Sequence, residues 1–183
     1  MTKKLLVLFL GNPILADDKI GLVIGEMLKP KLESEGHQVE ILEKTGYSLI
    51  DYLENRQEAV IVDSVKTGTH EVGEIVTIKA EDLQQYAPLT SHYVGIPEAL
   101  KMMTELGLNP PERIHILGIE VEDPYAISEE MSHKLTERLS ELSEEIHKSI
   151  SSIAHSVTER DRGPSKERNQ IPPHPRRDKV LHD

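Results

Sequence analysis

The chain has 183 residues, with 21 Lys or Arg against 32 Asp or Glu, so its formal net charge is −11 at pH 7. This acidic balance argues against general nucleic-acid binding, which requires positive charge to displace the counterions of the phosphates. The absence of cysteine excludes disulfides, catalysis by a thiolate, and zinc or iron–sulfur sites built from cysteine.

The length and the apolar segments indicate one α/β domain. A chain of this size is large enough to bury about 68–70% of its unfolded surface in a single core. Lys3 and Lys4 precede six apolar residues, but this run is shorter than the apolar region of a signal peptide, and no small-residue cleavage site follows it. No stretch approaches the length that crosses a membrane. We therefore expect a cytoplasmic protein.

The opening segment, residues 5–21, carries the most informative pattern. Six apolar residues (5–10) stop at Gly-Asn-Pro, and the adjacent acids Asp17 and Asp18 follow. A short continuous apolar run between turn residues is typical of a strand buried on both faces of a parallel sheet. Ligands of such sheets bind at the carboxyl ends of the strands, which is where this loop places its two carboxylates.

The remaining elements alternate between strand and helix patterns. We expect strands at residues 5–10, 39–42, 59–63, 74–79 and 113–119, and helices at 19–35, 47–54, 96–106 and 128–153. Ser128 is the predicted N-cap of the last helix, with acids in its first turn. The alternation predicts a three-layer α/β/α sandwich with a mostly parallel, twisted sheet of about five strands, in which strand 74–79 is the candidate for an antiparallel member.

The composition changes near residue 158. Residues 158–183 contain four prolines, many charges and almost no apolar side chains. Such a segment buries too little surface to offset the entropy of ordering it. We therefore predict a domain at residues 1–157 and a disordered tail at 158–183.

Three residues of the types that commonly bind metals follow predicted elements at the same edge of the sheet: Asp18, Asp63 and His92. Two carboxylates and one imidazole suit Zn²⁺, Ni²⁺ or a similar borderline cation, and three protein ligands leave a position for water or substrate. Each residue also has an ordinary explanation. An aspartate before a helix is usually an N-cap, so one of Asp17 and Asp18 is expected to cap; Asp63 can end a strand, and a single histidine is more often structural.

Four motifs together resemble the hydrogenase maturation endopeptidases. They are LGNPILADDKIG (residues 10–21), VIVDS (60–64), SHYVG (91–95) and LGIEVE (117–122), and the resemblance extends over about residues 4–150. It implies an α/β/α sandwich that removes a short C-terminal extension from the nickel-loaded precursor of a [NiFe] hydrogenase large subunit. Matched residue by residue, it implies that Asp18, Asp63 and His92 are both the catalytic and the metal-binding residues, with nickel supplied by the precursor. We expect a monomer.

Two departures from the family pattern affect loops. An acid followed by two glycines is common after the second strand in the family, and this chain has Glu43-Lys44-Thr45-Gly46; Val121-Glu122 stands where Pro-Glu is common. These differences leave open which hydrogenase is the substrate. Two alternative functions also remain, a nickel-binding chaperone that does not cut the precursor and a metal-dependent hydrolase of a small molecule.

Overall fold

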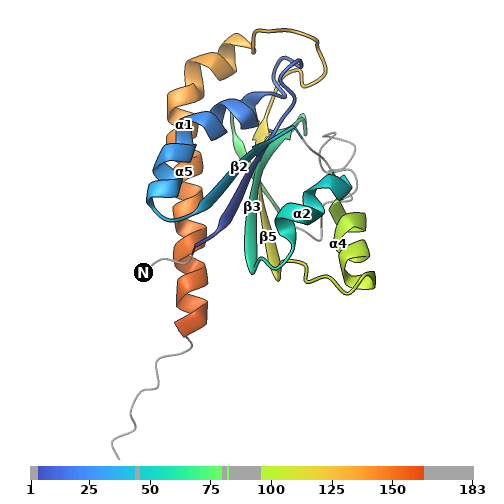
Figure 1. Ribbon diagram of the computed structural model, residues 1–183. Helices are drawn as coiled ribbons and strands as arrows, with labels where there is room; N and C mark the ends of the chain where they lie inside the picture. Colours follow the sequence, from blue (N-terminus) through green and yellow to red (C-terminus); the bar gives the residue numbers. More distant parts are fainter. Residues whose placement is uncertain (1–3, 44–45, 80–81, 83–95, 163–183) are drawn as a thin grey trace, which may run out of the picture.

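The computed structural model describes residues 4–43, 46–79, 82 and 96–162, and in it helices cover both faces of one sheet (Figure 1). The strands are β1 (Leu6–Leu10), β2 (Gln38–Leu42), β3 (Glu58–Val65), β4 (Ile75–Lys79) and β5 (Arg113–Glu120). Their order in the sheet is β2-β1-β3-β5-β4. β4 runs antiparallel to β5, and the other neighbouring strands pair in parallel. The predicted three-layer, mostly parallel sheet of five strands is confirmed.

The helices complete the two outer layers. They are α1 (Ile20–Ser34), the 3₁₀ helix η1 (Gly46–Leu49), α2 (Ile50–Leu53), α4 (Ile96–Glu105) and α5 (His133–Arg162). α1 packs against α5 on one face of the sheet, while α4 packs against η1 and α2 on the other face (Figure 1). No helix in the described part of the chain is both long enough and apolar enough to span a membrane.

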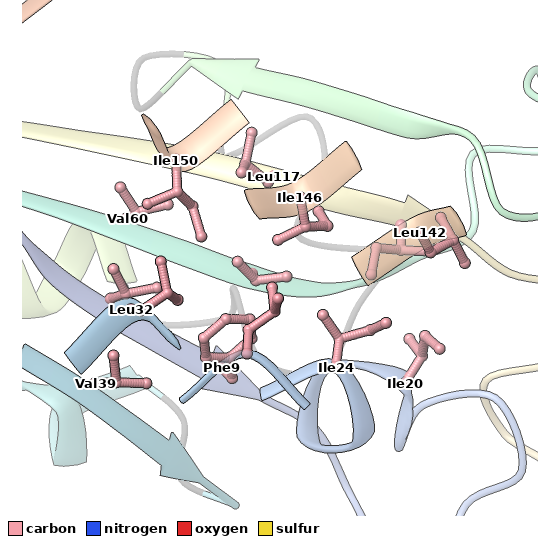
Figure 2. Close-up of a cluster of buried hydrophobic side chains, with 14 of the residues drawn as sticks. Phe9, Ile20, Ile24, Leu32, Val39, Val60, Leu117, Leu142, Ile146 and Ile150 are labelled. Carbon is pink, nitrogen blue, oxygen red and sulfur yellow. The ribbon is translucent and has the colours of Figure 1, made fainter. Parts of the chain in front are cut away.

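The central strands supply side chains to both cores because alternate residues of a strand point to opposite faces. Val7 and Phe9 of β1 join the core beneath α1 and α5, whereas Leu6, Leu8 and Leu10 join the core beneath α2 and α4. Figure 2 shows the first of these cores, in which side chains of α1 and α5 meet the sheet around Phe9. Every residue of β1 is buried, as the uninterrupted apolar run predicts.

Two glycines allow α1 to lie unusually close to the sheet. A Cβ atom added at Gly21 would lie 1.9 Å from the carbonyl oxygen of Leu10, and one added at Gly25 would lie 2.8 Å from Cβ of Phe9. Residues four apart lie on the same face of a helix, so both glycines face the strand. The first turn of α1, and with it the acidic pair just before the helix, is thereby held against the end of β1.

The start of the last helix was predicted wrongly. α5 begins at His133, and the hydroxyl of Ser128 instead accepts a hydrogen bond from the backbone N–H of Glu130, 3.1 Å away, in a turn before the helix. The helix begins later in the sequence because this segment bonds to the β1–α1 loop, where Ser128 N–H donates to the carbonyl of Ile14. The helix pattern predicted at 47–54 is divided between η1 and α2.

The other end of α5 also differs from the expectation. The helix continues to Arg162, so residues 158–162 of the predicted tail are helical. Residues 163–183 lie outside the described part of the chain, where the predicted disorder stays a prediction.

Candidate functional site

Two loops lie side by side at the carboxyl edge of the sheet, one between β1 and α1 and the other between β5 and α5 (Figure 1). Ala16 N–H donates to the carbonyl of Ala126 at 2.7 Å, and Leu15 and Ile127 form an antiparallel bridge. Residues more than 100 positions apart in the sequence are therefore joined by backbone bonds. The acids of the first loop, Asp17 and Asp18, follow Ala16 directly in the sequence.

Asp17 holds the two loops together. Its side chain is buried, and its carboxylate accepts hydrogen bonds from three backbone amides: Ser132 at 2.7 Å, Asp123 at 3.1 Å and Glu122 at 3.2 Å. The residue in the N-cap position of α1 is Lys19, and it makes no side-chain capping bond. The expectation that one of the two aspartates caps α1 is therefore wrong, because the β5–α5 loop supplies the amides that Asp17 binds.

Asp18 and Asp63 are brought together through Ser64. Asp18 is 2% exposed, and its Oδ1 accepts a hydrogen bond from the Ser64 hydroxyl at 2.5 Å. Asp63 is completely buried within β3, and its Oδ1 accepts the backbone N–H of Ser64 at 2.8 Å. Ser64 is itself 1% exposed. One buried serine thus contacts both predicted acids, one from the loop after β1 and the other from within β3.

Ser64 was present in the VIVDS motif but received no role from the sequence. A buried hydroxyl needs a hydrogen-bond partner, and here the donor meets a carboxylate, which makes a short, charge-assisted bond. The bond restricts the rotation of the Asp18 side chain. The position of Ser64 directly after Asp63 was the one signal in the sequence that could have identified Ser64 as part of the site.

The third predicted site residue, His92, lies outside the described residues. Among the residues that the structure describes, no group of three or more His, Cys, Asp or Glu side chains could hold a metal ion. The predicted set of Asp18, Asp63 and His92 therefore stays a prediction. Its two carboxylates and one imidazole have the donor chemistry that nickel and zinc accept.

Glu120 is a further buried acid at this edge, and its function is structural. It is 2% exposed at the end of β5. Its carboxylate accepts bonds from the Thr67 hydroxyl at 2.7 Å, the Gly68 amide at 2.8 Å and the Thr67 amide at 3.1 Å. Glu120 therefore orders the loop after β3 in the same way that Asp17 orders the loop after β5.

One exposed acid of the β5–α5 loop, Asp123, bonds to the backbone of the residues that follow it. The amides of Tyr125 and Ala126 donate to its Oδ1 at 3.0 and 3.1 Å, and these bonds lower the pKa of Asp123 below its usual value. A hydrogen bond to the ionised form favours that form. The loop beside the site consequently keeps its negative charge.

Three other histidines of the folded region make contacts away from Asp18 and Asp63. His115 Nε2 lies 2.8 Å from the carboxylate of Glu58, near the amino end of β3, and His133 is 85% exposed in its side chain. His147 lies on α5, and its side chain is only 16% exposed and contacts Glu35 at 2.8 Å. The helix turns it toward α1, because α1 packs beside α5.

Comparison with solved structures gives the same fold. The [NiFe] hydrogenase maturation protease HybD from Thermococcus kodakarensis is 22% identical, with a TM-score of 0.63 over 81% of this chain and 99% of that chain. The hydrogenase maturating endopeptidase HybD from E. coli is 22% identical, with a TM-score of 0.61 over 79% of this chain and 90% of that chain. The [NiFe] hydrogenase maturation protease HycI from T. kodakarensis KOD1 is 20% identical, with a TM-score of 0.58 over 79% and 90%.

No curated protein sequence matches the chain significantly. The family model HycI, described as hydrogenase maturation protease, matches residues 23–157, which is more than half of the chain. This match covers the segments that carry Asp63, His92 and the β5–α5 loop, while Asp18 lies just before it. The chain therefore belongs to the hydrogenase maturation protease family.

Proposed function

We propose that this protein is an endopeptidase that removes a short C-terminal extension from the nickel-loaded precursor of a [NiFe] hydrogenase large subunit. The observation that carries the proposal is the pair of buried acids, Asp18 and Asp63, joined through Ser64 at the carboxyl edge of a parallel sheet. Burying a carboxylate is costly unless the charge is used or compensated. Two such groups at the edge where α/β sheets bind ligands favour a site rather than a purely structural arrangement.

In this proposal nickel belongs to the substrate, and Asp18, Asp63 and His92 bind it while it sits in the precursor. Binding through the metal explains how one protease distinguishes a loaded precursor from an empty one. Zinc or another divalent ion of similar ligand preference fits the same three side chains. The Ser64 hydroxyl keeps the Asp18 carboxylate in one orientation, so that less rotational entropy is lost when the metal binds.

Hydrolysis adds water across the scissile peptide bond. The oxygen of water bonds to the carbonyl carbon, the bond between carbon and nitrogen breaks, and the nitrogen leaves as an amine after taking up a proton. The chain contains no cysteine to serve as a nucleophile, and the hydroxyl of Ser64, beside the site, donates to Asp18. In this proposal water attacks the carbonyl carbon directly, and no covalent intermediate forms on the enzyme. The buried carboxylates of Asp18 and Asp63 are suited to accept the proton of the attacking water.

The test is the intact mass of the nickel-loaded precursor before and after incubation with the protein. We expect loss of a short C-terminal peptide with the wild-type protein, and none with nickel-free precursor. Asp63→Asn and His92→Ala are expected to abolish the mass change. Asp51→Asn provides the matched control, because Asp51 is an exposed acid of α2 away from the carboxyl edge.

Two results contradict the proposal. Normal cleavage by both Asp63→Asn and His92→Ala would remove the assigned site. Stable binding of the loaded precursor by the wild-type protein without any loss of mass would instead identify a nickel-binding chaperone. Thermal unfolding of each variant establishes that a lost activity does not arise from a lost fold.

A further inference from the structure

Three large apolar side chains are exposed on the two loops that border the site. Ile127 is 84% exposed, Ile14 is 62% exposed and Tyr125 is 57% exposed. We refer to these three residues as the apolar rim. Single exposed apolar residues are common, but three of them on two loops that backbone hydrogen bonds join, beside a candidate site, offer apolar surface to a partner protein.

The backbone beneath the apolar rim is fixed before any partner arrives. The carbonyl of Ile14 accepts the amide of Ser128 at 3.2 Å, and Leu15 forms the bridge with Ile127. The buried side chain of Asp17 anchors the same segment through three partly buried hydrogen bonds. A surface that is already ordered loses little conformational entropy on binding, which increases affinity.

The loops that carry the apolar rim are rich in negative charge. Residues 121–132 contain four acids and no Lys or Arg. The four acids are exposed, and they are Glu122, Asp123, Glu129 and Glu130. Lys19 is the single Lys or Arg in the neighbouring loop, residues 11–19, and its Nζ is bonded at 2.8 Å to the carbonyls of Ser128 and Glu129. The two loops therefore combine exposed apolar side chains with an excess of exposed acids, and Lys66 is a positive charge that acts on Asp123.

We propose that the apolar rim docks a segment of the hydrogenase precursor in which apolar side chains are flanked by lysine or arginine; this inference rests on the proposed function. Complementary charge selects such a partner and speeds its encounter. A second copy of this chain is a poor occupant, because two acidic surfaces would face each other across the contact. Docking here places the bound segment beside Asp18, since the same loop carries both.

The first test measures processing kinetics of the nickel-loaded precursor with Ile127→Ser. We expect KM to rise about tenfold, which corresponds to about 1.4 kcal/mol of binding free energy, while kcat stays within about twofold because the contact is the same in ground and transition states. Leu106→Ser is the matched control. Leu106 is also exposed, by 67%, but it lies between α4 and the amino end of β5, whereas the rim loops follow the carboxyl ends of β1 and β5. Its KM is expected to equal that of the wild type.

The second test addresses charge. The double variant Glu129→Gln/Glu130→Gln is expected to raise KM at low salt and to weaken the dependence of KM on NaCl concentration, because screening acts on charges that are exposed. Glu105→Gln is the control, since its carboxylate is 66% exposed and pairs with Lys101 on α4. An unchanged KM for both Ile127→Ser and the double variant would overturn the inference.

Two further outcomes separate the inference from the proposed function. If the wild-type protein binds the precursor without cutting it, and Ile127→Ser weakens that binding about tenfold relative to Leu106→Ser, the docking surface stands and the protease assignment fails. If sedimentation shows that the wild-type protein self-associates and that Ile127→Ser makes it monomeric without changing its binding of the precursor, the occupant is a second copy and the inference fails.

Discussion

The contact between Gly21 and the end of β1 leads to a quantitative prediction for Gly21→Ala. The added Cβ would lie 1.9 Å from the carbonyl oxygen of Leu10, whereas real Cβ atoms essentially never approach closer than 3.0 Å. The obstacle is backbone, which cannot rotate away as a side chain can. The variant must therefore shift the start of α1 away from the sheet by about 1 Å, a size of misplacement that is costly at a catalytic site.

The cost of this shift follows from two opposing effects. Overpacking a filled core costs about 1–3 kcal/mol, and a clash with backbone belongs at the upper end of that range. Alanine gains at most about 1 kcal/mol over glycine in a helix, and Gly21 is the second residue of α1. We expect Gly21→Ala to lose about 2 kcal/mol of unfolding free energy, which lowers Tm by about 4–8 °C in a chain of this size.

Urea unfolding followed by circular dichroism measures this loss directly. Glu26→Ala is the control, because Glu26 is exposed on the same helix and its substitution tests helix propensity alone. Under the proposed function, the rate of precursor processing should fall by more than the loss of folded protein explains, since Asp18 lies three residues before Gly21. Equal or greater stability of Gly21→Ala compared with the wild type would refute the reasoning.

Three other predictions concern buried polar groups. Asp17→Ala leaves three amides of the β5–α5 loop without their acceptor. We expect the free energy of unfolding to fall by about 2 kcal/mol and hydrogen exchange in residues 122–132 to become faster. Unchanged exchange there would contradict the anchoring role. Glu58→Ala removes a carboxylate that is 4% exposed and binds Arg113, His115 and Arg160. Because these partners keep contact with solvent, we expect the free energy of unfolding in urea to fall by about 2–3 kcal/mol, below the largest values for buried pairs. A loss under 1 kcal/mol would show that the cluster is dispensable. Burial lowers the pKa of His37 below 6.5 against the opposing charge of Glu35. The unfolded chain therefore binds the proton more readily, and the free energy of unfolding should fall as pH drops below about 6.5. His37→Gln should show a flatter pH dependence of stability, and identical pH profiles for the two proteins would be inconsistent with a neutral buried imidazole.

The sheet and its central strands were predictable because their signals are local. Six consecutive apolar residues at 5–10 require a strand buried on both faces, and the run that ends at Asp63 repeats the pattern. Parallel pairing then brings the ends of both strands to one edge, so the proximity of Asp18 and Asp63 follows from topology alone. The glycines at 21 and 25 lie at helical spacing, but their contact with Leu10 and Phe9 appears only in the packed structure.

The residues that organise the edge of the sheet were decided by tertiary structure. Asp17 resembles an N-cap in sequence, yet its partners lie more than 100 residues away, and Glu120 binds a loop more than 50 residues earlier. Ser128 has the sequence of a cap, but its backbone pairs with the β1–α1 loop and the helix starts later. Sequence patterns determine which residues are buried, because burial follows apolar periodicity. Which polar group satisfies which buried amide depends on distances across the folded chain, and no local pattern encodes them.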